Sequence, residues 1–466
     1  MELLGSGIAA AGQGTLAGMD LASVISPEAI VKPEGRFLAD LMGRGVQGTA
    51  DAVVLPSTTE EVAAVMRWCY DNEVPLTARG GGTGLAGGAI PVGGGVVVGF
   101  ERLNRIRQFD PLLWRIHVDA GVTTGDVQRL ARESGLRFPP DPGAAEISQI
   151  GGNIACNAGG PHAFKYGVTG HWVTGLEAVV PPGEIVTFGG PLRKDVAGYD
   201  LKSLLVGSEG TLGLVTSAWL RLVPAPELEL PVVGLYRNAD AGIGAIERVL
   251  ASGVVPSAIE YVDGVMLSYS GGAYPFGVPE DAAFMVITEA DGAVPEARRV
   301  AAELREALAE DAVALHAPEE PSDVAELWRW RGSAAFAVLA QRGGAYSEDI
   351  AVPLDRLRDV ARETLEIGAR HNVHALSFGH AGDGNIHSTF LFAPEDLDEE
   401  ARADDACREL FDLALRLGGS VSGEHGIGWL KRGQLERQLG AVGYDLHLRI
   451  KQAFDPKNLL NPGKKR

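Results

Sequence analysis

The pattern of hydrophobic and polar positions changes near residue 224. Before it, short apolar segments such as 51–56 predict strands, and the amphipathic segment 62–70 predicts a helix. From 224 to about 420, strands alternate with long amphipathic helices, of which 295–309 is an example. The change follows a Pro-Ala-Pro sequence and predicts a boundary between two domains. We expect an α+β fold in which the helices of the second domain cover one face of an antiparallel sheet.

Composition and charge exclude several classes of protein. The 466 residues are 45% hydrophobic and 22% charged, as in a globular chain rather than a disordered one. The formal net charge of −20 disfavours non-specific binding to nucleic acid. Three cysteines provide neither a disulfide framework nor a structural zinc site, which agrees with a reducing compartment. No stretch is apolar enough to span a membrane, so we expect a cytoplasmic protein with at most peripheral contact with the inner membrane face.

Glycine is abundant, with 62 residues, and gathers in three loops at the ends of predicted strands, over 79–88, 150–160 and 207–213. Glycines allow positive φ and let consecutive backbone N–H groups approach an anion closely. A single glycine run is more often a sharp turn, but three runs favour a cofactor that lies in a long crevice. Their spacing fits neither the Rossmann fingerprint nor a P-loop, so the loops indicate another dinucleotide-binding fold.

Two short polar motifs in the last third of the chain contain candidate metal ligands. The sequence Gly-His-Ala-Gly-Asp-Gly-Asn-Ile-His places His380 and His387 at the two ends of a turn between predicted strands, and Ser-Gly-Glu-His-Gly supplies Glu424 and His425. Two imidazoles and a carboxylate leave coordination positions open, as in a catalytic divalent metal site. Either histidine alone would more often be a hydrogen-bonded loop residue, but the two motifs together favour a metal site.

The glycine loops and their flanking residues resemble the FAD-binding segments of the vanillyl-alcohol-oxidase-type flavoproteins. Within this superfamily, the chain is most similar to the FAD-linked D-2-hydroxyacid dehydrogenases of the glycolate oxidase D-subunit and D-lactate dehydrogenase type, from about residue 46 to 463. The resemblance implies non-covalent FAD, because the loop 79–88 lacks the histidine that tethers the flavin in some relatives. The implied cofactor-binding residues are Arg79, Gly80, Gly81, Gly82, Thr83, Gly84, Leu85, Gly88, Pro139, Gly143, Gly151, Gly152, Asn153, Asn157, Gly160, Tyr166, Gly207, Glu209, Gly210, Gly213 and Asn461.

The resemblance also implies a division into four segments. Residues 1–45 form a leader and a first helix, and 46–223 form an FAD-binding domain of the PCMH type. Residues 224–425 form an α+β substrate or cap domain with the metal site, and 426–466 dock back on the FAD domain. We therefore expect the active site at the interface of two domains, a frequent location for small-molecule pockets.

The resemblance assigns roles to five residues. The residues of relatives that match His380, His387 and Glu424 bind zinc or manganese. The residue that matches His425 is the general base, and the one that matches Arg331 binds the substrate carboxylate. An imidazole with a pKa near 6.5 is suited to accept the hydroxyl proton near neutral pH, while a planar guanidinium suits a carboxylate.

The implied reaction is oxidation of a small D-2-hydroxy acid to the 2-oxo acid, with hydride transfer to flavin N5. Relatives specific for a larger dicarboxylate carry a lysine where this chain has Ser347 and Glu348, so we expect D-lactate or glycolate as the substrate. The sequence leaves open whether His162 and Lys165 contact the flavin or stabilise their loop.

Three other functions remain open from the sequence. A same-fold oxidase would pass electrons to dioxygen instead of a quinone, a cytochrome or an electron-transfer protein. A non-catalytic FAD subunit of a multi-subunit glycolate oxidase would be expected to have degraded metal motifs, whereas all four residues of the two motifs are intact here. A metal-dependent hydrolase without flavin would leave the glycine loops unexplained. Partner subunits are compatible with the first two.

Overall fold

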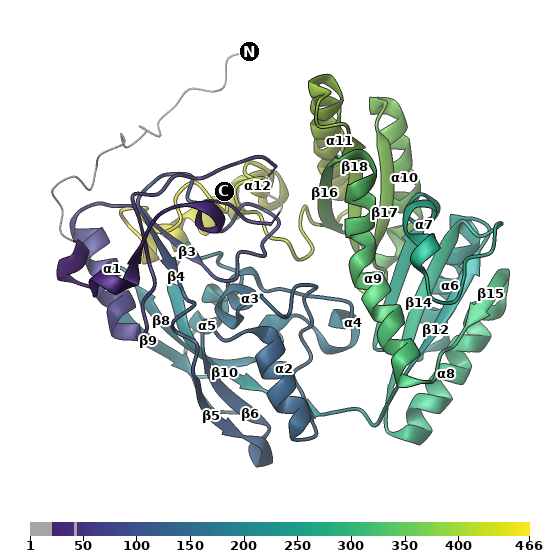
Figure 1. The fold of residues 1–466 in the computed structure, drawn as a ribbon, viewed down its shortest axis with the longest axis horizontal. Helices are drawn as coiled ribbons and strands as arrows, with labels where there is room; N and C mark the ends of the chain where they lie inside the picture. The colour runs from purple at the N-terminus through teal and green to yellow at the C-terminus, as the bar shows by residue number, and fades with distance from the viewer. Residues whose placement is uncertain (1–20, 42–43) are drawn as a thin grey trace.

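The structure of the chain is a computed structural model that describes residues 21–41 and 44–466. It divides into two parts, each with its own sheets (Figure 1). The first part contains the chain up to about residue 224 and the C-terminal segment, which is yellow in Figure 1 and lies against the N-terminal half. The second part is built on residues 228 to about 420.

A four-stranded and a five-stranded sheet form the first part. The four-stranded sheet contains, in spatial order, β1 (Ile30–Val31), β2 (Ala52–Val54), β4 (Val96–Gly99) and β3 (Leu76–Arg79). The antiparallel five-stranded sheet contains β5 (Ile106–Asp110), β6 (Arg115–Asp119), β10 (Leu214–Arg221), β8 (Val173–Val180) and β9 (Glu184–Gly189). The connecting elements are α1 (Thr59–Asp71), α2 (Thr124–Glu133), α3 (Ile150–Cys156), α4 (Ala163–Tyr166), α5 (Leu201–Leu205) and the short pair β7 (Leu136–Arg137) and β11 (Val223–Pro224).

Helix α1 confirms the amphipathic segment predicted near its position. The Thr58 side chain accepts a hydrogen bond from the Glu61 backbone N–H at 3.2 Å, and the Glu61 carboxylate accepts one from the Ser57 backbone N–H at 2.6 Å. This reciprocal capping box satisfies two N–H groups that the start of a helix leaves unpaired. Val62 and Met66 on the buried face then pack against the four-stranded sheet.

One seven-stranded antiparallel sheet forms the centre of the second part. Its strands are, in spatial order, β15 (Ala312–His316), β12 (Leu228–Tyr236), β14 (Phe284–Gly292), β13 (Ala258–Asp263), β17 (His374–His380), β18 (Asn385–Phe392) and β16 (Gly344–Ala351). Its helices are α6 (Ala239–Ser252), α7 (Gly264–Ser270), α8 (Val294–Ala309), α9 (Pro321–Arg342), α10 (Leu357–His371) and α11 (Leu397–Arg416). The α+β class with an antiparallel sheet is therefore confirmed.

The prediction that helices cover only one face of this sheet is wrong. Helices α6, α8, α10 and α11 pack on one face, where they contact side chains such as Tyr261 and Phe284. Helices α7 and α9 pack on the other face, against the neighbouring residues Val262 and Met285. Because successive side chains of a strand point to opposite faces, a strand buried on both faces is apolar throughout and does not show how many helix layers cover it.

The C-terminal segment joins the first part through backbone pairing. After α12 (Gln434–Phe454), Leu459 O accepts a hydrogen bond from Leu76 N at 2.9 Å, and Asn461 N donates to Leu76 O at 2.7 Å. These bonds extend the edge of β3, which ends at the first glycine loop. Among the described helices, none combines the length and the hydropathy that a membrane crossing requires.

A buried polar network connects the two parts. The imidazole of His162, in the loop before α4, lies between Asp141 of the first part at 2.5 Å and Glu289 of β14 at 2.8 Å. Lys165 and Tyr166 of the same helix both bond to Asp291, two residues further along β14. Burial alone would lower the pKa of His162, but the two carboxylates outweigh it and raise that pKa to about 10. His162 therefore joins the parts as a cation.

We expect the change His162→Gln to lower the free energy of unfolding by about 3 kcal/mol at pH 6, because the buried Glu289 and the partly buried Asp141 lose their cation. A raised folded-state pKa gives stability that is complete below pH 6.5 and is lost as the pH rises through about 10. The difference between wild type and variant should therefore decrease between pH 6.5 and 9, by up to about 1.4 kcal/mol per pH unit. Urea denaturation at pH 6 and at pH 9, followed by circular dichroism, measures this difference in the free energy of unfolding. An equal difference at the two pH values would contradict a cationic His162.

Candidate active site

A cavity of about 620 Å³ lies between the two parts. One side is formed by the three glycine loops, and the other by α9, β16, β17, β18 and the turn that contains Glu424. The predicted cofactor residues that line it are Gly80, Gly81, Gly82, Thr83, Gly84, Leu85, Gly88, Gly143, Gly151, Gly152, Asn153, Gly160, Glu209, Gly210 and Gly213. Arg331, His380, His387, Glu424 and His425 line the same cavity. The predicted cofactor residues and the predicted catalytic and metal-binding residues thus face each other across one space.

The glycine loops pack backbone against backbone. A Cβ atom on Gly81 would lie 2.1 Å from Ile147 O, and one on Gly80 would lie 3.3 Å from the Cα of Gly152. The first distance is far below van der Waals contact, so a side chain at residue 81 would force the loops 79–84 and 147–152 apart. Glycine is needed here because the wall of the cavity is made of backbone, whose N–H groups can face a bound anion.

Six predicted cofactor residues do not line the cavity: Arg79, Pro139, Asn157, Tyr166, Gly207 and Asn461. Several of them support the loops instead. Arg79 donates to Ala39 O at 3.0 Å, and the Asn157 side chain accepts from Gly170 N at 2.8 Å. Asn461 donates to both Gly88 O and Glu209 O, at 2.9 and 2.7 Å, and so ties the C-terminal tail to two glycine loops.

The candidate metal ligands converge from three segments. His380 ends β17 and His387 lies in β18, so the hairpin between these strands brings the two imidazoles to a ring-centroid distance of 5.3 Å. Glu424 Oε1 lies 3.4 Å from His380 Nε2 and 3.5 Å from His387 Nε2. All three ligand atoms lie within 4.8 Å of one another. The His425 ring stacks on His387 with the centroids 5.1 Å apart.

Charge and burial prepare this cluster for a cation. Burial, together with the neighbouring ring of His425, lowers the pKa of His387 to about 3. Burial opposes ionisation of Glu424, but the three neighbouring imidazoles outweigh it and lower its pKa to about 2. A neutral imidazole and an ionised carboxylate are the forms that bind a metal. Burial opposes ionisation of His380, but the carboxylates of Glu260 and Glu424 outweigh it and raise the pKa of His380, so an ion at this point would take the place of the proton on its Nε2.

Two buried carboxylates that the sequence analysis did not identify are hydrogen-bonded to this cluster. Asp349 accepts hydrogen bonds from the backbone N–H groups of Gly423, Glu424 and His425, at 2.6, 2.6 and 3.0 Å. Glu260 accepts from His380 Nδ1 at 2.6 Å. The only sequence signal for Glu260 is a charged residue within the apolar strand segment Ala-Ile-Glu-Tyr-Val, and the two side chains that donate hydrogen bonds to it are 71 and 120 positions away.

Arg331 reaches the cavity from α9. Its Nη2 donates to Glu260 at 2.6 Å, and its guanidinium lies 5.3 Å from the centroid of the Phe378 ring. The buried Nε of Arg331 has no hydrogen-bond partner among the described residues. An unpaired buried donor is costly, and a carboxylate in the cavity would satisfy it.

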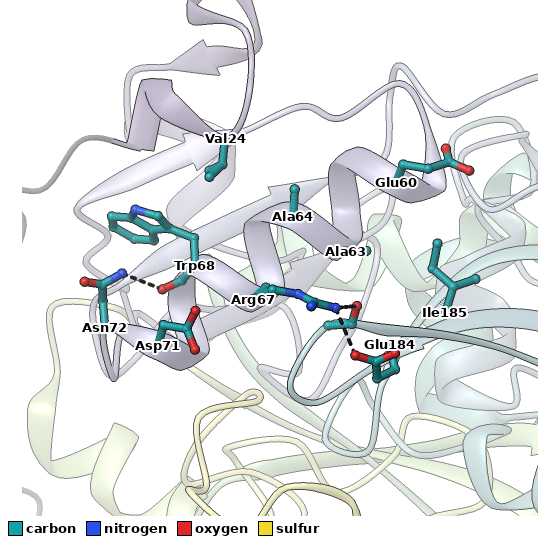
Figure 2. A pocket seen from close by; sticks show the side chains of 11 residues that line it. Val24, Glu60, Ala63, Ala64, Arg67, Trp68, Asp71, Asn72, Glu184 and Ile185 are labelled. Atoms are coloured by element: carbon teal, nitrogen blue, oxygen red, sulfur yellow. Dashed lines mark hydrogen bonds and ion pairs between the residues drawn. The ribbon is translucent and has the colours of Figure 1, made fainter.

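A second hollow on the molecule lacks this chemistry. It is an open groove between α1 and the β8–β9 hairpin, where Arg67 pairs with Glu184 (Figure 2); the two side chains are 2.9 Å apart. Among the described residues that line it there is no histidine or cysteine and no group of metal-ligating side chains. The cavity between the two parts is therefore the candidate active site.

Comparison with known proteins agrees with this arrangement. The chain matches the C-terminal domain of FAD linked oxidases over residues 226–465 and an FAD binding domain over 50–189. It is 39% identical to glycolate oxidase subunit GlcD of Bacillus subtilis over 420 residues, which are 90% of this chain and 89% of that protein. It is 32% identical to D-lactate dehydrogenase of Anaerostipes hadrus over 439 residues, 92% of each chain.

The fold is also similar to a solved structure. The crystal structure of p-cresol methylhydroxylase with substrate bound matches with a TM-score of 0.79 over 97% of both chains; at 17% identity this is a likeness of fold. The predicted PCMH-type FAD-binding fold is confirmed.

We expect the change Gly81→Ala to weaken FAD binding at least about tenfold, because the new methyl group overlaps Ile147 O and displaces the loop wall. The measurement is the ratio of flavin to protein absorbance after gel filtration, followed by titration with FAD. Gly190→Ala is the matched control, since a Cβ there meets no atom within 4 Å. Equal flavin retention by both variants would show that the loop contact at residue 81 is unimportant.

Proposed function

Because this chain belongs to the family of FAD-linked oxidases, we propose that it oxidises a small D-2-hydroxy acid, D-lactate or glycolate, to the corresponding 2-oxo acid. The observation that carries the proposal is the cavity in which the glycine wall faces His380, His387, Glu424, His425 and Arg331. The glycine wall alone would suit many flavoproteins, and the histidine cluster alone would suit a hydrolase. Their position on opposite sides of one space favours a reaction between a flavin and a metal-bound substrate.

The residues present fit both groups. The backbone wall has no room for a side chain at Gly81, as expected for a surface that a nucleotide cofactor contacts. The ligand atoms of His380, His387 and Glu424 lie close enough for one ion and leave coordination positions for substrate oxygens. The nitrogen and oxygen donors suit Zn²⁺ or Mn²⁺. When bound, FAD supplies the hydride acceptor and the ion lowers the pKa of the substrate hydroxyl.

Each polar residue of the opposite wall then has a defined task. Arg331 binds the substrate carboxylate through the donors that Glu260 does not occupy. His425 accepts the hydroxyl proton, and its position is fixed by the Asp349 contacts to its own backbone and to those of the two preceding residues. The domain interface encloses the substrate, which keeps water from the reacting atoms.

The end of the cavity favours a small monocarboxylate. Ser347 and Thr389 line it and bond to each other at 2.8 Å, so both hydroxyl groups face a neutral neighbour. Glu348 instead turns to Arg44, and it is not part of the cavity lining. A second substrate carboxylate would thus meet no cation at Ser347 or Glu348, which agrees with D-lactate or glycolate rather than a dicarboxylate.

We further propose that the electrons pass to a quinone, a cytochrome or an electron-transfer protein. The relatives named glycolate oxidase subunits support partner chains for such a protein. A purely non-catalytic subunit would not need the complete set of His380, His387, Glu424 and His425 at one cavity.

Anaerobic mixing of the purified yellow protein with a panel of D- and L-2-hydroxy acids tests the proposal. We expect D-lactate or glycolate to bleach the flavin absorbance and a chelator to abolish the bleaching, with recovery on addition of Zn²⁺ or Mn²⁺. L-lactate and D-2-hydroxyglutarate serve as controls for stereochemistry and size. Bleaching that is insensitive to complete metal removal would contradict the metal step.

We expect the change His425→Asn to leave the flavin spectrum unchanged and to slow bleaching by about 10²- to 10⁴-fold, because the substrate proton loses its acceptor. His316→Asn is the matched control: this histidine of β15 contacts Tyr274 away from the cavity, and we expect a normal rate. Stopped-flow absorbance measures both rates. A normal rate for the His425 variant would exclude it as the base.

A further inference from the structure

Glu260 is a buried carboxylate that contacts two functional residues at once. It lies in β13 with its side chain fully buried. One oxygen accepts from His380 Nδ1 at 2.6 Å, and the other accepts from Arg331 Nη2 at 2.6 Å. His380 ends β17, the strand that pairs with β13, whereas Arg331 lies in α9. No other described residue is hydrogen-bonded to both of them.

We propose that Glu260 is a positioning residue that sets the metal-binding nitrogen of His380 and the orientation of Arg331 together. This inference rests on the proposed function and deepens it. Glu260 contacts neither substrate nor flavin in this arrangement, because the side chains that it holds lie between it and the cavity. It therefore acts through the two residues rather than in the reaction itself.

The sheet fixes one of the two contacts. Glu260 and His380 are direct partners in the antiparallel pairing of β13 and β17, so their side chains leave the same face side by side. The hydrogen bond directs the Nδ1 proton toward Glu260, so Nε2, which lies 3.4 Å from Glu424, is the nitrogen that an ion can reach. A carboxylate behind a ligating histidine orients the ring and increases its basicity.

The helix supplies the other contact. Arg331 lies one turn after Trp328, whose indole donates to Glu289 at 2.6 Å, so α9 is already held against β14. Glu260 then holds one end of the guanidinium while the Nε remains without a partner among the described residues. The same carboxylate thus fixes the position of Arg331, the proposed donor to a substrate carboxylate, relative to His380, which would hold the ion.

A count of hydrogen-bond donors and acceptors shows what the change Glu260→Gln would do to the two contacts. A carboxylate accepts at both oxygens, whereas an amide has one acceptor and one NH₂ donor. If the amide oxygen stays on His380, the NH₂ group faces the donors of Arg331 and their bond is lost. If the oxygen turns to Arg331, the NH₂ group requires His380 Nδ1 to accept, which moves the proton to Nε2 and blocks the metal ligand. The amide cannot serve both partners.

The test measures Zn²⁺ affinity on FAD-loaded protein without substrate, by competition with a chromophoric chelator, and then KM and kcat with D-lactate or glycolate. For Glu260→Gln we expect Zn²⁺ affinity to fall 10- to 100-fold. We expect KM to rise at least about fivefold at saturating Zn²⁺, because Arg331 is no longer held for the substrate carboxylate. Zn²⁺ affinity within twofold of wild type together with an unchanged KM would overturn the proposal.

Glu399→Gln is the matched control, because Glu399 is a buried carboxylate of the same domain that pairs with Arg342 at 2.8 Å away from the cavity. Loss of its charge should change stability without changing Zn²⁺ affinity, and an equal loss of affinity in both variants would overturn a specific role for Glu260. Should Glu260→Gln fail to fold, Glu260→Asp retains two acceptors on a side chain one methylene shorter and cannot reach both partners. We expect it to lower Zn²⁺ affinity or raise KM, and wild-type values for both would contradict the inference.

The same titration distinguishes this inference from the proposed function. Wild-type protein that binds Zn²⁺ no better than His387→Ala would overturn the metal site, and the role of Glu260 with it. Tight binding by wild type, loss in His387→Ala and wild-type behaviour of Glu260→Gln would overturn only the role of Glu260.

Discussion

The neutralisation of buried carboxylates at the interface between the two parts is the constraint on which the site depends. An unpaired charge in such an interior costs several kcal/mol, so each carboxylate must be met by donors from elsewhere in the chain. Asp349 is fully buried and is met by Lys431 and by three backbone N–H groups of the turn at 423–425. The donors around Asp349 hold its pKa far below its usual range although burial opposes this. The position of the turn is therefore fixed by the hydrogen bonds that its backbone N–H groups donate to the buried charge of Asp349.

The turn that contains Glu424 and His425 is held from both parts of the molecule. Asp349 of the seven-stranded sheet binds its first half. Glu209 of the third glycine loop accepts from Ile427 N at 3.0 Å and from Gly428 N at 2.7 Å, directly after it. The turn that carries the proposed base and one proposed metal ligand is thus hydrogen-bonded to the third glycine loop on one side and to β16 on the other, and it cannot shift without breaking these hydrogen bonds. This arrangement supplies the fixed geometry that positional catalysis requires.

The sequence predicts those features of this site that are encoded locally. Contiguous glycines, as in 79–88, and the spacing of His380 and His387 across a short turn are visible in a few residues, and the structure brings them to one cavity. The contacts of Asp349 with Lys431, 82 positions away, have no local signature. The same limit applies to Asn461, which was expected at the cofactor but lies behind two glycine loops, because the pairing of the tail with β3 is a long-range contact.

Helix α9 illustrates why fold and site could not be predicted separately. Its apolar residues Leu327, Trp330 and Ala334 pack on the sheet, while Trp328 and Arg331 turn toward the cavity. The sequence indicates a long helix here but does not show which sheet face it covers, and the expectation of a single helix layer would have left Arg331 without a defined place. Once α9 covers the face that meets the glycine loops, Trp328 bonds to the same Glu289 that binds His162. Trp328, which bonds to the carboxylate that joins the two parts, and Arg331 at the cavity then lie within one helical turn, so the contact between the parts and the position of Arg331 depend on the same short segment.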